Sequence, residues 1–309
     1  MIPLKQSEAV FSGRPSVQLS SPQGGGLSPT WEIWAGLRRS PSGVVGLLLL
    51  LIHLLIALSA PVLAPYDPVA FDTKALRAAP SLAHPFGTDK LGRDVFSRTV
   101  WGGRTALAVT AVGTMLAVTW GGLLGITLGY VGGIWDELAL RLVDVLLALP
   151  RLLVLLLTVG TLGADTGVLI GVLSFLYGIA VIRMARAATL ELVGREFVLA
   201  AYAIGARRRT IILRELLPNV LDLLLVEGAL RWSGMLLSFS ALSFLGFGIV
   251  PPTPDWGLMI ADGRELLALA PWISFFPIAA ISTLIIGINL LAGALTKVIG
   301  LDRRDGAAR

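Results

Sequence analysis

The sequence predicts an all-α integral membrane protein with six transmembrane helices. Its 309 residues are 55% hydrophobic and only 15% charged, with a mean hydropathy of +0.80. Soluble domains carry about 25% charged residues, so lipid must solvate most of this chain. Six apolar runs are about 20 residues long, which is enough for a helix to cross a bilayer. These runs lack the period-two alternation of a membrane β-barrel, and a helix is the other structure that satisfies its backbone hydrogen bonds in lipid.

The predicted spans, in chain order, are residues 43–64, 107–130, 138–160, 166–182, 220–247 and 275–299. About forty residues precede the first span, which is far longer than the charged region of a cleavable signal peptide, so we expect this span to be retained. When the N-terminus is placed inside, arginines and lysines favour the cytoplasmic side by about two to one. The sequence therefore predicts that both termini are cytoplasmic.

The remaining residues divide the chain into four parts. Residues 1–40 are rich in Ser, Pro and Gly, which predicts a disordered cytoplasmic tail. Residues 41–103 hold the first span and an external loop. Residues 104–300 form a core with five spans and a cytoplasmic loop at 183–219, and residues 301–309 form a second cytoplasmic tail.

The external loop ends in a segment that mixes apolar and charged residues, namely Leu91, Val95 and Phe96 with Arg93, Asp94 and Arg98. This pattern suits a short helix lying in the membrane interface, with its arginines at the level of the headgroups. The alternative is a solvated helix start that anchors the second span. Within that span, Gly121, Gly125 and Gly129 recur every four residues and predict close packing against another helix.

Charged residues inside the predicted spans are costly in lipid and therefore informative. Asp144 and Arg151 flank Pro150, which lacks a backbone donor and predicts a kink. These two charges either line a pathway or form a structural ion pair near the membrane surface. Glu227 and Arg231 are four residues apart on one helix face, so we expect them to pair with each other. The alternative for this second pair is a functional site within the membrane.

Several kinds of chemistry have no support in the sequence. The absence of cysteine excludes disulfides and thiolate metal sites. Its two histidines, His53 and His84, cannot form a multi-histidine metal cluster, and we expect His53 to be neutral and hydrogen-bonded to a neighbour. No GxxxxGK[ST] phosphate loop, HExxH helix or GxSxG elbow is present, so we predict no catalytic site and no resident cofactor. The arginines lie at predicted membrane edges, which argues against a nucleic-acid partner.

The loop at 183–219 has the residue pattern of a docking surface. Phe197, Ala200, Ala201 and Ile204 recur at i, i+3, i+4 and i+7, which predicts an amphipathic helix over residues 196–204. Gly205 is placed to end that helix or to allow a partner to approach closely.

The second half of this loop is basic and ends at a proline. Arg207, Arg208 and Arg209 complement the negative end of the first helix. A second short helix is expected over 210–216. Pro218 should break it and start the fifth span, with Asn219 available for the freed backbone groups. From the residues alone, an ordinary amphipathic connector explains the loop as well as a docking surface does.

Leu199-Ala200-Ala201, followed by Gly205 and by Leu217-Pro218, resembles the EAA signature of ABC importer permeases. Leu199 stands in place of the signature's glutamate, and Glu196 is acidic slightly upstream. Segments 84–107, 129–150 and 241–260 resemble the dipeptide/oligopeptide/nickel subfamily, and the likeness runs from about Pro65 to Asp302. The chain departs from the subfamily at Phe239, where many relatives are acidic, and at Arg151, where a small residue is common.

This resemblance implies a type I ABC importer permease fold in a bacterial inner membrane, with this chain as the C-type subunit. The implied partners are a second homologous permease, two ABC ATPases that bind ATP and Mg, and an external solute-binding protein. The implied cargo is a di- or oligopeptide, with a nickel chelate or another small solute as the alternative. The implied ATPase-coupling residues are Glu196, Ala200, Ala201, Gly205, Arg207, Arg208, Leu217 and Pro218.

The same resemblance places a proline-stiffened external segment between the last two spans. Its residues are Pro251, Pro252, Asp255, Trp256 and Gly257. They would form an external gate or contact the binding protein, and the alternative is a rigid connector.

A different class of function is an ATP-independent secondary transporter or channel. It would use Asp144, Arg151, Glu227 and Arg231 as coupling charges and would show paired inverted repeats. No convincing repeat is present, and this reading leaves the loop at 183–219 unexplained. Nothing specific in the sequence supports a membrane scaffold without transport.

Overall fold

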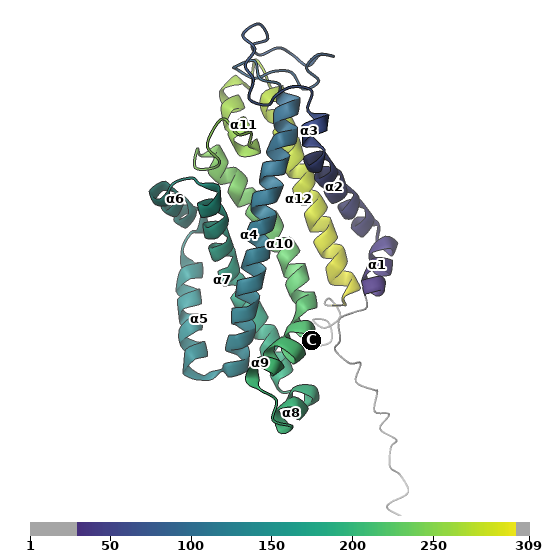
Figure 1. Ribbon diagram of the computed structural model, residues 1–309, viewed down its shortest axis with the longest axis vertical. Coiled ribbons are helices and arrows are strands. Elements are labelled where there is room, and N and C mark those ends of the chain that lie inside the picture. Colours follow the sequence, from purple (N-terminus) through teal and green to yellow (C-terminus); the bar gives the residue numbers. More distant parts are fainter. Residues whose placement is uncertain (1–29, 301–309) are drawn as a thin grey trace, which may run out of the picture.

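The computed structural model describes residues 30–300, and they form one elongated bundle of helices (Figure 1). The predicted tails at 1–40 and 301–309 lie outside the described residues, apart from residues 30–40. In this part of the chain, the only backbone pairing of the β type is a single antiparallel bridge between Thr88 and Asp94. The helices are α1 (Thr30–Arg39), α2 (Pro41–Leu58), α3 (Ala60–Leu63), α4 (Val95–Val131), α5 (Gly133–Ala148), α6 (Arg151–Leu162), α7 (Thr166–Val193), α8 (Glu196–Ala203), α9 (Arg208–Thr210), a π-helical segment η1 (Ile211–Leu216), α10 (Leu217–Phe244), α11 (Trp256–Gly263), a 3₁₀ turn η2 (Arg264–Leu266) and α12 (Trp272–Val298).

Among residues 30–300, four helices are long and apolar enough to cross a membrane: α2, α4, α7 and α12. The α5–α6 pair makes a fifth if its two bent halves count as one span. α10 occupies the position of the predicted fifth span and is 28 residues long. It carries Asp222, Glu227 and Arg231, and these charges lower its hydropathy. The described helices thus establish a multi-pass membrane protein, while length and composition alone identify four or five spans.

The second span begins much earlier than the sequence predicts. α4 starts at Val95, where the Asp94 side chain accepts a hydrogen bond from the Ser97 amide at 2.7 Å and so caps the helix. A separate helix in the membrane interface is therefore wrong, and the segment is the start of α4. Arg93 and Arg98 are buried, so their side chains contact protein and do not face lipid headgroups. Both pair with Asp89, at 2.6 Å and 3.7 Å respectively.

The third predicted span is broken rather than kinked. α5 and α6 meet at an angle of 87° around Leu149 and Pro150. Proline disfavours a helical conformation in the residue before it, and Leu149 is extended at φ −74° and ψ 136°. The predicted change of direction at Pro150 is therefore present, but the chain turns by nearly a right angle there and the helix is interrupted.

The glycine stripe of α4 packs against α7, as predicted. A Cβ added at Gly121 would collide with the carbonyl oxygen of Gly178, and one added at Gly125 would collide with that of Ile182. Gly129 lies against Thr189 in the same way. Close backbone approach supplies the dispersion contacts that hold helices together in lipid, so α4 and α7 form a tight pair.

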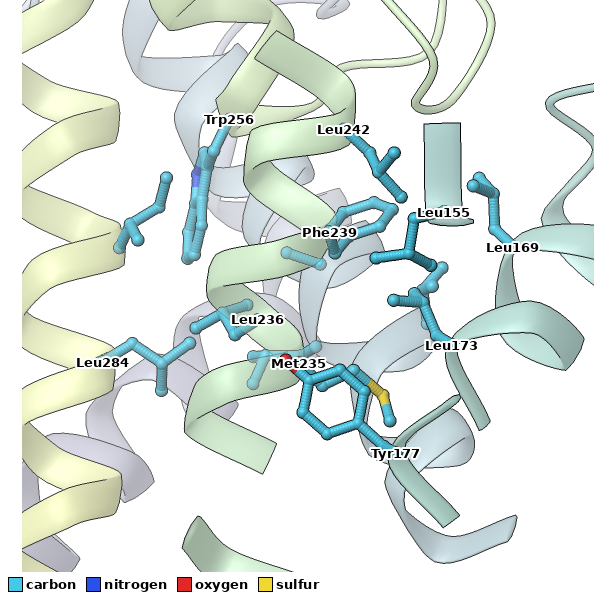
Figure 2. Packing of buried hydrophobic residues seen from close by; sticks show 14 of the residues in the cluster. Leu155, Leu169, Leu173, Tyr177, Met235, Leu236, Phe239, Leu242, Trp256 and Leu284 are labelled. Atoms are coloured by element: carbon cyan, nitrogen blue, oxygen red, sulfur yellow. The ribbon is translucent and has the colours of Figure 1, made fainter. Parts of the chain in front are cut away.

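The main hydrophobic core surrounds α10 (Figure 2). Figure 2 shows Met235, Leu236, Phe239 and Leu242 of α10 at the centre, between side chains of α6 and α7 on one side and those of Trp256 and α12 on the other. Phe239 is fully buried, so its apolar ring belongs to this core. A smaller second cluster joins α4, α7, α8, η1 and α10 near one end of the bundle.

Candidate functional site

The connection between α7 and α10 lies at one end of the bundle, at the bottom of Figure 1. We call it the α8 end, and we call the opposite end, with α11 and the loop at 64–94, the α11 end. The predicted loop start at residue 183 is wrong, because α7 continues to Val193. Arg183 and Arg186 therefore lie on α7, where they pair with Asp144 and Asp136 of α5. The connection itself comprises residues 194–217 and is called the α7–α10 connection below.

α8 ends at Ala203 and is capped by Gly205, which is one of the two roles predicted for this glycine. The amide of Ala206 donates to the carbonyl of Ala201 at 3.0 Å, and the amide of Gly205 donates to that of Tyr202 at 3.0 Å. These two hydrogen bonds define a Schellman cap, which requires a left-handed residue. Gly205 has φ +78°, a conformation in which a side chain is strained. At the other end of α8, Glu196 lies in the first turn, where a negative charge stabilises the helix.

α8 rests on the bundle through part of the predicted face, because Phe197 and Ala201 pack there but Ala200 and Ile204 do not. Val198 is buried, with Phe197 and Ala201 half-buried beside it in the second cluster. Ile204 was expected on the buried face but is 85% exposed, and Ala200 is exposed too. The cap at Gly205 reverses the chain directly after α8, so the last turn of the helix projects away from its neighbours.

The outer surface of α8 is apolar and surrounded by positive charge. The exposed fractions are 55% for Leu199, 72% for Tyr202 and 85% for Ile204. Arg207, Arg208 and Arg209 follow directly and are all exposed. A contiguous apolar patch with a charged rim is typical of a protein–protein interface. Leu199 and Tyr202 were missed as surface residues, although the eight-residue helix EFVLAAYA is apolar on all sides and so cannot bury them all.

Pro218 does not break the helix that precedes α10. η1 has the wider π-helical turn, in which the Leu217 amide donates to the carbonyl of Ile212, five residues back. The side-chain amide of Asn219 donates to the carbonyl of Glu215 at 2.6 Å, which is the role expected for it. The helix from Arg208 through α10 is therefore continuous, with Leu217 and Pro218 half-buried where η1 passes into α10.

The intramembrane charges are engaged within the chain. Asp144 pairs with Arg183 and not with Arg151. The Arg151 guanidinium lies 4.3 Å from the ring centroid of Tyr177, close enough for a cation–π contact. Glu227 forms the predicted ion pair with Arg231 and is only 3% exposed.

In the segment between α10 and α11, residues 251–253 are exposed and residues 254–257 are buried. Pro251 and Pro252 are exposed, whereas Asp255, Trp256 and Gly257 are buried. The Trp256 indole donates to the carbonyl of Thr99 at 2.7 Å. Asp255 caps α11 by accepting from the Leu258 amide at 3.1 Å. Burial raises the pKa of this carboxyl to about 6, and the Leu258 hydrogen bond only partly offsets the effect.

Within residues 30–300, no group of three His, Cys, Asp or Glu side chains is placed to hold a metal ion. The ring nitrogens of His53 lie 2.8 Å from the carbonyl oxygen of Leu49 and 3.2 Å from that of Ala280, and a neutral ring, which has one N–H, donates to one of the two. His84 pairs with Asp94 at 3.0 Å. Both histidines therefore have structural partners.

The fold and these contacts agree with the similarity of the chain to known proteins. Residues 121–301 match the family described as "Binding-protein-dependent transport system inner membrane component", and residues 28–81 match the "N-terminal TM domain of oligopeptide transport permease C". The chain belongs to the ABC importer permeases of the peptide/oligopeptide/nickel family.

Particular relatives carry a more specific name. "Glutathione transport system permease protein GsiD" of Shigella dysenteriae serotype 1 (strain Sd197) is 35% identical over 273 residues, which is 88% of this chain and 90% of that relative. The proteins of the same name from Escherichia coli O1:K1 / APEC and from Escherichia coli O6:K15:H31 (strain 536 / UPEC) are 35% and 36% identical over the same shares.

Proposed function

We propose that this chain is one of two transmembrane subunits of an ATP-driven importer in a bacterial inner membrane. In this proposal it has six spans, with α10 as the fifth, and both termini in the cytoplasm. ATP and Mg are bound by two separate ATPase subunits, which dock against the α7–α10 connection. An external solute-binding protein delivers the cargo.

The observation that carries the proposal is the structure of the α7–α10 connection. α8 exposes an apolar, arginine-rimmed surface, yet its other face is fixed to the bundle through Val198. Val198 packs in one cluster with residues from the three long helices, Ile126 of α4, Val181 of α7 and Val220 of α10. A close-packed cluster transmits displacement rather than absorbing it. A partner that pushes α8 therefore moves three long helices together, which is how ATPase closure would rock the bundle.

The pairing of the intramembrane charges favours this mechanism over an ATP-independent transporter. Glu227 and Arg231 neutralise each other on α10. Asp144 and Arg183 also pair, but their side chains are 61% and 55% exposed, and an ion pair facing lipid is costly. We propose that this face of α5 and α7 lines the aqueous pathway or is covered by the second permease, with Arg151 near it on α6.

At the α11 end, the exposed prolines are the part of the 251–257 segment available to a binding protein. Buried Asp255, Trp256 and Gly257 hold those prolines in place. The proposed cargo is a di- or oligopeptide, which the family and the glutathione-transporting relatives support. A nickel chelate or another small solute is the alternative within the same family.

Reconstitution of the chain with its permease partner, its ATPases and its binding protein tests the proposal. We expect ATP-driven uptake of the peptide that the binding protein carries. Gly205→Asp should reduce uptake at least tenfold, because it distorts the cap that orients α8. Failure of the chain to co-purify with any ATPase, together with unchanged uptake in Gly205→Asp, would refute it.

A further inference from the structure

The α8 end contains a pocket as well as a projecting helix. Its volume is about 250 Å³, and it opens beside α8. It is lined by the ends of α4 and α7, by α8 and by the start of α9, through Tyr130, Val131, Val193, Val198, Leu199, Tyr202 and Arg208. A cavity of roughly 150 Å³ holds a benzene molecule, so this pocket has room for one large apolar side chain.

The floor and walls of the pocket are apolar, and its rim is positive. Val198 is buried beneath it, whereas Val131 and Tyr202 are 45% and 72% exposed. Arg208 is exposed at the edge and followed by Arg209. Among the exposed side chains of residues 191–214, arginines outnumber glutamates by five (195, 207, 208, 209 and 214) to two (191 and 196). The surface therefore complements an acidic partner that carries an apolar projection.

We infer that this pocket receives an aromatic or large aliphatic side chain of the partner ATPase, flanked by carboxylates that pair with Arg208 and its neighbours. The inference rests on the proposed function and extends it. Besides the surface that α8 presents to the ATPase, the permease offers a pocket that the ATPase fills. A protein partner is favoured over an anionic lipid surface because the pocket is concave and is lined in part by α8, which lies at the projecting end of the bundle (Figure 1).

The position of the pocket gives it a mechanical consequence. A side chain seated there touches the ends of α4 and α7 directly as well as α8. α4 and α7 are held together along Gly121, Gly125 and Gly129, so they move as one unit. The ATPase thus contacts the closely packed α4–α7 pair directly. It can therefore move this pair in both directions, and not only through α8.

Filling the pocket tests the inference. Val131→Trp places a large side chain at an exposed position of the wall, and we expect the affinity for the purified ATPase to fall at least tenfold. Leu123→Trp is the matched control on the same helix, because Leu123 is also partly exposed but lies outside the pocket. Its affinity should stay within twofold of the parent chain.

Charge reversal tests the rim. Arg208→Glu should lower the affinity at least tenfold and weaken its dependence on salt between 50 and 300 mM NaCl, since a charge-assisted contact is screened by salt. Arg141→Glu is the control, because Arg141 is 73% exposed on α5 and does not line the pocket.

A photo-crosslinking residue at Val131 or Tyr202 identifies the occupant, and Trp34 on α1 is the control position. The inference predicts crosslinks from Val131 and Tyr202 to the ATPase chain. Crosslinks from Val131 to lipid, or an ATPase that binds Val131→Trp as tightly as the parent, would overturn it while leaving the proposed function intact. An ATPase that fails to bind even the parent chain would overturn the proposed function as well.

Discussion

The two ends of the bundle differ in how far their charged and aromatic side chains are buried. At the α11 end, Asp89, Arg93 and Arg98 are each at most 6% exposed and pair with one another, and the Trp256 indole is buried against α4. At the α8 end, Tyr202 and Ile204 are 72% and 85% exposed. Buried charge is tolerated where each group has a partner, and exposed apolar area usually marks a missing one. The α11 end therefore satisfies its buried charges within this chain, whereas the α8 end exposes apolar side chains that another protein can cover.

Removal of a buried charge should give the largest contrast between the ends. Asp89→Ala leaves Arg93 and Arg98 buried without their shared carboxylate, and breaking a buried ion pair costs about 3–5 kcal/mol. Glu196→Ala at the exposed α8 end should change stability by less than about 0.5 kcal/mol. Thermal unfolding in detergent measures both, and equal unfolding midpoints would break the comparison.

Removal of an aromatic side chain at each end is the second contrast. Trp256→Ala deletes a buried indole and its hydrogen bond to Thr99, at a cost of about 3–5 kcal/mol. Tyr202→Ala removes an exposed ring and should leave the free energy of unfolding within about 0.5 kcal/mol of the parent. The comparison is contradicted if Tyr202→Ala destabilises the isolated chain as strongly as Trp256→Ala does.

The buried carboxyl at the α11 end predicts a pH dependence. The pKa of Asp255 is raised from 3.8 to about 6, so the folded state favours its protonated form. The stabilisation is complete below pH 4 and is lost as the pH rises through 6, by about 3 kcal/mol in all. Asp255→Asn keeps a capping side chain, and its unfolding midpoint should lose this part of the pH slope between 4 and 6. An unchanged slope would show that Asp255 is not held neutral.

Substitution of two glycines by alanine should give the smallest changes in stability, and the two changes should have opposite signs. Gly205→Ala forces a side chain into the left-handed region and should destabilise the chain by about 1 kcal/mol. Gly171→Ala lies inside α7 with open space around it and should stabilise the chain by up to about 1 kcal/mol. Parallel thermal unfolding of the two variants checks the signs, and ATP-driven uptake should fall only in Gly205→Ala. A Gly205→Ala variant that is as stable as the parent or more stable would contradict the role of Gly205 as a cap.

Features that depend on neighbours along one helix could be predicted from the sequence. The Glu227–Arg231 pair, the cap at Gly205 and the glycine stripe of α4 all follow from spacing. A helix start before the second span was one of the two alternatives for residues 91–98, but its burial could not be predicted, because Arg98 is 1% exposed only through contacts with the distant loop at 64–94.

The orientation of α8 also depends on tertiary contacts. With apolar residues on every side, its periodicity did not distinguish the face that packs near Ile126 from the face that carries Ile204. The pocket beside α8 forms where the ends of α4 and α7 come close to α8. Only the tertiary fold brings these elements together, so no local sequence pattern predicts the pocket.

Amide hydrogen exchange of the purified permease, with and without its ATPase subunits, tests the central claim most directly. We expect the ATPase to slow exchange in residues 196–208 and at the adjoining ends of α4 and α7, and to leave residues 84–100 unchanged. Unchanged exchange in α8, or protection at the α11 end instead, would contradict the account.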